Sequence, residues 1–252
     1  MIKQIVFSLL LIMPMQAPGR APPQSLPIGD CNSPASRHDY THCDFSGRDL
    51  TGVDLQGSRL SGVNFQNARL IDCNLSQAIL VNADLKWAML SGCEADAADF
   101  TDADLFHTNF DESSLNRSNF TNAYLFGASI NEASANGANF SNANMKDISM
   151  EESRLDDCVF DQAFMMRAVL IGSTLRRTSL RQVVLTGAAL EQADFTQADL
   201  SGSLLNGVAL TETIFREANL EGVRFVNARV QSVDLTGARG LANDFPGVLG
   251  KP

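Results

Sequence analysis

The stretch ADFTQADLSGSLLNG, residues 193–207, consists of three five-residue units, each with a large apolar residue at its centre and a small residue two positions before it. The same frame runs without insertion or deletion from Tyr40 to Leu235, with Leu or Phe at most of the centres. A period of five fits neither a helix, with about 3.6 residues per turn, nor a plain strand, which alternates at every second residue. A frame of this regularity indicates a repeat architecture.

These units and others, such as ANFSNANM at residues 138–145, resemble the pentapeptide-repeat family, A(D/N)Lxx, over residues 40–239. The resemblance implies an all-β fold, a right-handed quadrilateral parallel β-helix (a solenoid) of about ten four-sided coils. It also implies that the central residue and the small residue two places before it point into the tube, while the other three point outward. Packing supports this expectation, since one large and one small side chain on each side can fill a narrow tube without voids.

The N-terminal segment differs in composition from the repeats. Residues 1–20 carry Lys3 and then an apolar run, 5–13, which is too short to span a bilayer and is typical of a secretory signal peptide. The alternative is a hydrophobic terminus of a cytosolic protein. We therefore expect a periplasmic or secreted protein, and a cytoplasmic one if the N-terminus is not cleaved. No later stretch is long enough for a transmembrane helix.

The two ends of a stacked-coil rod must be covered. Residues 21–39 are expected to form an N-terminal cap or linker, and residues 240–252 a C-terminal cap or dimerisation segment. In the first case the apolar residues of the C-terminal segment cover the last coil, and in the second they join two rods into a homodimer. These residues are Leu241, Phe245, Val248 and Leu249.

The chain is acidic, with 29 Asp and Glu against 19 Lys and Arg, and its formal net charge is -10. Direct binding to nucleic acid or to an anionic membrane needs a basic footprint, so neither is expected. A cationic partner, or a site that normally holds DNA, suits this charge better.

With four units in each coil, residues 20 apart stack and the outward positions sort into four faces. The outward aromatic residues of the repeats all belong to the face centred on Leu85, Leu105 and Leu125. Large apolar patches mark interaction sites, and aromatic residues dominate such sites, so this aromatic face predicts partner binding or self-association. The alternative is a ladder of rings that only stabilises adjacent coils. The predicted residues are Trp87, Phe106, Tyr124, Phe126, Phe164 and Met166.

The next face, centred on Leu50, Leu70 and Leu90, is acidic. It is either a phosphate-like row for a basic partner or a solvated face that keeps the rod soluble, and the second interpretation is favoured. A third face mixes Arg with Asp, which predicts local ion pairs. The acidic face carries Asp111, Glu112, Glu132, Glu151, Glu152, Glu191 and Glu212. The mixed face includes Arg176, Arg177, Asp156, Asp157 and Asp194.

Four of the five cysteines, Cys43, Cys73, Cys93 and Cys158, occupy the small inward position, where a thiol packs as a small apolar group. Cys73 and Cys93 are 20 residues apart and should stack. In-register parallel neighbours point their Cβ atoms alongside each other, so no disulfide is expected between these two residues. A disulfide between Cys31 and Cys43 is left open, because Cys43 should face inward.

The residues Cys31, His38, His42 and Cys43 also suggest a zinc site, but they lack paired C-x-x-C spacing, and no metal site is assigned. The repeats offer no cleft, no phosphate loop and no base beside a nucleophile, so neither catalysis nor a cofactor is expected.

The favoured function is that of an exported, non-catalytic scaffold that binds a protein partner through its aromatic face. The family resemblance implies an alternative, because some members resemble duplex DNA in girth and charge and bind DNA gyrase in its place, which protects against quinolones. The predicted signal peptide and the absence of a loop between repeats count against this alternative.

Overall fold

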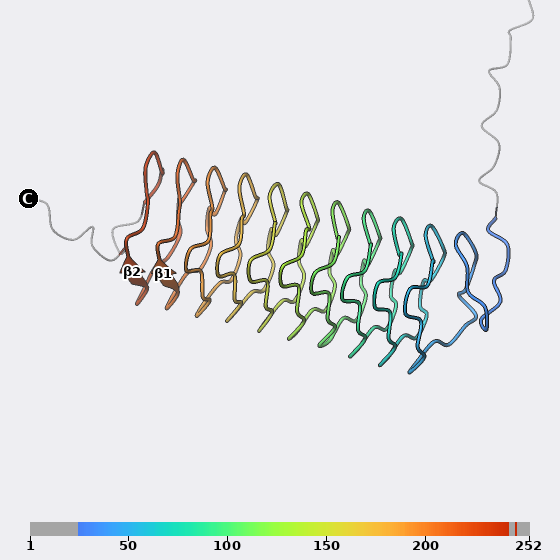
Figure 1. The fold of residues 1–252 in the computed structure, drawn as a ribbon. Helices are drawn as coiled ribbons and strands as arrows, with labels where there is room; N and C mark the ends of the chain where they lie inside the picture. Colours follow the sequence, from blue (N-terminus) through green and yellow to red (C-terminus); the bar gives the residue numbers. More distant parts are fainter. Residues whose placement is uncertain (1–24, 242–244, 246–252) are drawn as a thin grey trace, which may run out of the picture.

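The computed structural model describes residues 25–241 and Phe245, which form a rod of stacked coils (Figure 1). Each outward strand residue pairs with the residue 20 positions later, as in the parallel bridges Asp84↔Asp104 and Asp104↔Tyr124. In the described chain, two segments pair over three residues, β1 (Ala209–Thr211) and β2 (Arg229–Gln231), which are parallel and in the same 20-residue register. The predicted all-β quadrilateral β-helix is confirmed.

Backbone hydrogen bonds join every coil to the next. Leu85 N–H donates to Asp104 O at 2.8 Å, and Asp104 N–H donates back to Ala83 O at 2.9 Å. A third bond, from Ala88 N–H to Leu85 O at 2.9 Å, closes the corner between two sides. This set repeats along the rod, so the backbone groups of each short side find partners without long strands.

The corners impose a second five-residue period. A positive φ falls at every fifth residue from Gly47 to Gly237, two places after each centre. A turn with one left-handed residue at its third position is of the type II kind, which Gly and Asn adopt most readily. The frame of the sequence is therefore set by the corners as well as by the core.

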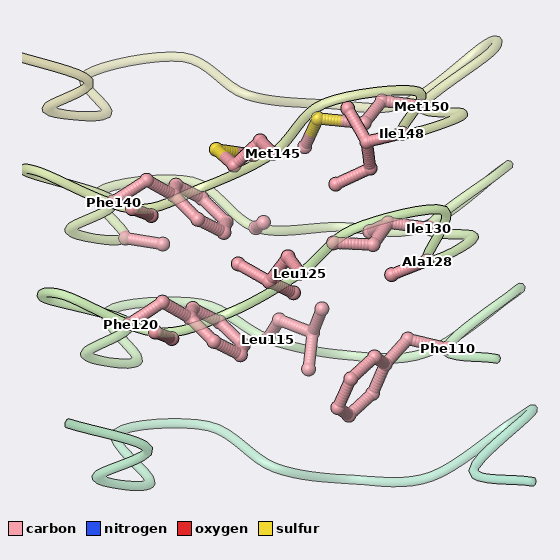
Figure 2. Packing of buried hydrophobic residues seen from close by; sticks show 14 of the residues in the cluster. Phe110, Leu115, Phe120, Leu125, Ala128, Ile130, Phe140, Met145, Ile148 and Met150 are labelled. Carbon is pink, nitrogen blue, oxygen red and sulfur yellow. The ribbon is translucent and has the colours of Figure 1, made fainter. Parts of the chain in front are cut away.

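The core is a continuous column of buried side chains along the tube. Phe100, Phe120, Phe140 and Phe160 stack at centroid distances of 4.8, 4.8 and 5.0 Å and are fully buried. Figure 2 shows Phe120 and Phe140 directly above one another, with Leu125 and Met145 on the neighbouring side. The Phe residues of this column thus stack one above another at the spacing of the coils.

The described part of the N-terminal cap covers the first coil. Gly29 N–H donates to Asp39 O at 3.0 Å, and Ile28 forms a parallel bridge with Asp39. Gly29 lies against the buried Tyr40 ring, where a Cβ atom would come within 2.1 Å of a ring carbon, so only glycine fits. The Tyr40 hydroxyl donates to Ala35 O at 2.9 Å. The open end of the tube is therefore closed by pairing and by a buried ring.

Two disulfides cross the coils. Cys73 and Cys93 are bonded with their Cα atoms 4.6 Å apart, so the expectation of two separate thiols was wrong. Parallel Cβ atoms at this separation still permit a bond, because rotation about each Cα–Cβ bond turns the sulfur along the tube axis. Cys31 and Cys43 are bonded as well, at a Cα separation of 5.6 Å. Cys43 does face inward, and Cys31 of the cap packs against the core beside it.

At the C-terminal end, Leu241 packs against the core, and the buried Phe245 ring lies edge-on to Phe225 at 4.9 Å. Val248, Leu249 and the predicted signal peptide, residues 1–20, lie outside the described residues. Within the described part of the chain, no helix has the length and apolar character needed to cross a membrane.

Candidate functional site

The predicted aromatic face contains one compact group of rings, which we call the aromatic cluster: Trp87, Phe106, His107, Tyr124 and Phe126. Phe106 is at its centre, because its ring lies 5.1 Å from Trp87, 5.6 Å from Phe126 and 6.1 Å from Tyr124. Trp87 and Tyr124 are 51% and 38% exposed, so the rings that hold each other in place also face solvent.

His107 belongs to this cluster although the predicted site residues omit it. Its ring lies parallel to Trp87 at 4.4 Å and edge-on to Phe106 at 4.3 Å. The signal was present in the sequence, since His107 lies 20 residues after Trp87 and must stack on it. The sequence therefore places His107 on the aromatic face beside Phe106.

The backbone places these rings at corners. Trp87 and His107 have φ values of 61° and 52°, in the left-handed region that bulky residues rarely adopt. Gly127 occupies the corner one coil after His107, and a Cβ atom there would lie 2.5 Å from the imidazole ring. The glycine therefore makes the space in which His107 lies flat.

Phe164 and Met166 share the aromatic face but lie apart from the cluster. The bridges Tyr124↔Asn144 and Asn144↔Phe164 place a polar coil between them. On that coil, Lys146 Nζ lies 5.4 Å from the centroid of the Phe126 ring, a cation–π contact that covers this end of the cluster. The structure thus brings four of the six predicted residues together and leaves these two in a separate group.

Charges around the aromatic cluster compensate each other locally. Lys86 Nζ lies 3.0 Å from Asp84 and 3.2 Å from Asp104, and its hydrogen bonds to both carboxylates raise the pKa of Lys86. One coil beyond Lys146, Arg167 pairs with Asp147, and the hydrogen bond from the guanidinium lowers the pKa of that carboxyl. The aromatic face is therefore close to neutral in a chain that is strongly acidic.

The predicted acidic face does not form one uniform row. Glu112, Glu132 and Glu152 occupy exposed corners of three successive coils. Asp111 instead accepts hydrogen bonds from Asn131 N–H at 2.9 Å and Asn109 Nδ2 at 3.0 Å. Its carboxylate therefore stabilises the corner and links it to the next coil. Glu151 lines a shallow hollow together with Glu132 and Glu152. Glu191 is half-buried. Glu212 accepts a hydrogen bond from Gln192 Nε2 at 3.0 Å.

Ion pairing on the mixed face is as predicted. Arg176 Nε lies 2.8 Å from Asp194, and Arg177 Nη2 lies 2.7 Å from Asp157 and 3.8 Å from Asp156. The hydrogen bond from Arg177 lowers the pKa of the Asp157 carboxyl. Both arginine side chains are half-exposed and solvent screens their charges, so these pairs add little to stability.

The comparisons with known proteins agree with the geometry. The sequence matches the description "Pentapeptide repeat region" over residues 36–120 and "Pentapeptide repeats (8 copies)" in four segments between residues 103 and 239. No curated protein sequence matches the chain.

Solved structures include similar rods. HetL, a pentapeptide repeat protein involved in heterocyst differentiation regulation in the cyanobacterium Nostoc sp. strain PCC 7120, is 27% identical over 77% of this chain and 86% of its own, with a TM-score of 0.67. QnrB1, a plasmid-mediated fluoroquinolone resistance protein, is 19% identical over 76% of this chain and 88% of its own, with a TM-score of 0.41. The five-residue frame, the square coils and the matches over residues 36–239 together show that the chain belongs to the pentapeptide-repeat family.

Proposed function

We propose that this protein is a non-catalytic binding module that contacts a protein partner through the aromatic cluster. Proteins of this family are generally non-catalytic. The observation that carries the proposal is the exposure of ordered aromatic rings on the locally neutral face of an acidic rod. Aromatic residues supply much of the binding energy at protein interfaces, and rings already fixed by their neighbours lose little further entropy on binding.

A ring ladder that serves only stability explains this cluster less well. Stacking between coils needs one ring above another, as with Phe106 and Phe126 at 5.6 Å. It does not need a ring as exposed as that of Trp87, which is 51% exposed although it lies parallel to His107 at 4.4 Å. A tryptophan this exposed is better accounted for by recognition.

We further propose that the protein is exported, which rests on the sequence of residues 1–20 alone. Fractionation of the cells that produce it, with mass spectrometry of the mature N-terminus, tests this proposal. Cleavage between about residues 17 and 30 and recovery outside the cytoplasm support export. An intact N-terminus in the cytosol contradicts it.

The binding proposal is tested with the full chain carrying Phe106→Ser, Tyr124→Ser and Phe126→Ser. A matched control carries Ile79→Ser and Met89→Ser, which remove exposed apolar side chains from two other faces. Quantitative cross-linking in the producing cells and light scattering of the purified chains should show contacts or multimers that the triple variant loses and the control keeps. Equal association of all three proteins, with unchanged circular dichroism, contradicts the proposal.

A second candidate function is DNA mimicry toward a topoisomerase, which the exposed corners Glu112, Glu132 and Glu152 favour. One acid on each coil gives a charge about every 4.8 Å along this column, against about one every 3.4 Å along a single strand of duplex DNA. The sparse charge makes this the weaker candidate. Protection of gyrase from a quinolone in a supercoiling assay, lost on Glu→Gln exchange at these three positions, would favour it over the first proposal.

A further inference from the structure

Three side chains that can bind a metal ion meet where the N-terminal cap joins the first coil. His42 Nε2 lies 3.4 Å from Cys31 Sγ and 3.6 Å from Cys43 Sγ, and the three donor atoms lie within 4.8 Å of one another. His38, the fourth residue that the sequence suggests, is placed elsewhere, since its Nδ1 contacts Ser36 O at 2.7 Å. One imidazole nitrogen therefore faces both sulfurs of the cap disulfide.

The two sulfur–nitrogen distances resemble those in a tetrahedral zinc site. Zinc binds thiolate sulfur at about 2.3 Å and histidine nitrogen at about 2.0 Å, so neighbouring sulfur and nitrogen ligands lie about 3.5 Å apart. Both sulfur–nitrogen distances here are within about 0.1 Å of that value. Only the separation of the two sulfurs must increase, to about 3.8 Å, and this follows when the disulfide is broken.

We propose that reduction of the Cys31–Cys43 disulfide creates a site for a thiophilic divalent cation such as Zn²⁺, with Cys31, His42 and Cys43 as ligands and the fourth position open to water. A dithiol supplies the two electrons and two protons of the reduction and leaves as its own disulfide. The two cysteine thiols then release their protons to solvent and bind the cation as thiolates, and His42 binds through its neutral Nε2.

Contacts of the cap hold Cys31 in position in addition to the disulfide. Asp30 turns the chain around it, because Asn32 N–H donates to Asp30 Oδ1 at 2.9 Å and Ser33 N–H to Asp30 O at 3.1 Å. Arg48 Nη1 donates to the carbonyl of Cys31 itself. On the other side of the site, Cys43 N–H donates to Tyr40 O at 2.8 Å. The reduced ligands therefore stay close together, which lowers the entropy lost on binding the cation.

Access distinguishes this cluster from the other cysteines. Cys31 is half-buried and His42 is exposed, so a reductant and a hydrated cation can reach them. Cys73 and Cys93 are fully buried, and burial raises the pKa of the free Cys158 thiol to about 12, so it remains protonated and does not bind metal near neutral pH. The cap disulfide is thus the one among the described residues that can alternate between a covalent link and a metal site.

The test uses the full chain, reduced with dithiothreitol, freed of the reductant by gel filtration under nitrogen, and titrated with Zn²⁺ against a chromophoric chelator. The reduced chain should take up one Zn²⁺ and the oxidised chain none. Co²⁺ should give the absorption bands of a tetrahedral thiolate site. His42→Ala, which leaves the disulfide intact, should weaken binding at least tenfold, since even the loss of an outer contact of a zinc site weakens binding about tenfold or more.

His38→Ala is the matched control, because it removes a neighbouring histidine of the cap that is not a ligand, and its affinity should equal that of the wild type. The proposal is overturned if the reduced chain takes up no Zn²⁺, or if His42→Ala and His38→Ala bind equally well. It is also overturned if a Cys31→Ser and Cys43→Ser double variant that keeps the circular dichroism of the rod binds Zn²⁺ as tightly as the reduced wild type.

Discussion

Aromatic rings stack along this rod in two places, once inside the tube and once on its surface. Inside, Phe100, Phe120 and Phe140 lie parallel at 4.8 Å and are fully buried. Outside, Trp87 lies parallel to His107 at 4.4 Å, and a half of its surface meets solvent. The geometry of stacking is nearly the same, because in both places the coils impose it.

The two stacks differ in what the fold requires of them. The inner stack fills a tube that must be packed without voids, so a large apolar side chain is needed at each centre. The outer stack lies on the surface and fills no internal space. Its rings Trp87 and His107 occupy corners with a positive φ, a conformation that is strained for bulky residues. Rings that the fold does not need are therefore the ones to test for a function.

The largest difference in the free energy of unfolding is expected between two variants, one that removes an inner aromatic ring and one that removes an outer one. Phe120→Ala should lower the free energy of unfolding by about 3–5 kcal/mol, because it leaves a cavity between Phe100 and Phe140. Phe126→Ala removes a half-exposed ring from Phe106 and should lower it by about 0.5–1.5 kcal/mol. Urea unfolding of both variants measures the difference. Equal losses would mean that the outer rings stabilise the fold as much as the core does.

The disulfide inside the tube should contribute nearly as much to the free energy of unfolding as an inner ring does. Removing the Cys73–Cys93 disulfide by Ala at both positions releases a loop of 20 residues in the unfolded chain, which should lower stability by about 3 kcal/mol. Cys158→Ala is the control, since it removes a buried thiol from the same inward position without breaking a link. If the double variant unfolds at the same urea concentration as this control, the link does not constrain the unfolded chain.

The sequence predicts the inside of this molecule far better than its outside. The inward positions follow from spacing alone, because two side chains of every five enter the tube, and the corners follow from the same frame. The Cys73–Cys93 bond was missed because spacing gives the separation of two residues but not the rotation of their side chains. The aromatic face was predicted as one patch, and the structure divides it at Asn144, since a single polar coil is enough to separate exposed rings.

The outer stack can be changed without touching a ring. Gly127→Ala adds a methyl group 2.5 Å from the His107 imidazole at a φ of 63°, and should lower stability by about 1–2 kcal/mol while tilting His107 against Trp87. Gly62→Ala is the control, because its φ is 69° and nothing lies within 4 Å of the new methyl group. Trp87 is the one tryptophan of the chain, so its fluorescence reports on this stack directly. A shift in emission only for Gly127→Ala is expected, and identical spectra would show that His107 does not depend on the glycine.

The smallest effect is expected from an exposed ion pair near the C-terminal end, far from both stacks. Hydrogen bonds from Thr236 and from Arg216 Nε, the latter at 2.6 Å, lower the pKa of Asp234 to about 2. Because the folded pKa is lower than the ordinary value near 4, the contribution of Asp234 to stability is complete above about pH 4 and is lost as the pH falls toward 2. Arg216→Gln should raise the pKa of Asp234, and Arg224→Gln, two sides of the coil away from Asp234, should leave it unchanged. Carboxyl titration by NMR measures both variants. If the pKa of Asp234 is the same in both variants, the hydrogen bonds from Thr236 alone lower it. The ion pair with Arg216 then contributes nothing to the pKa of Asp234.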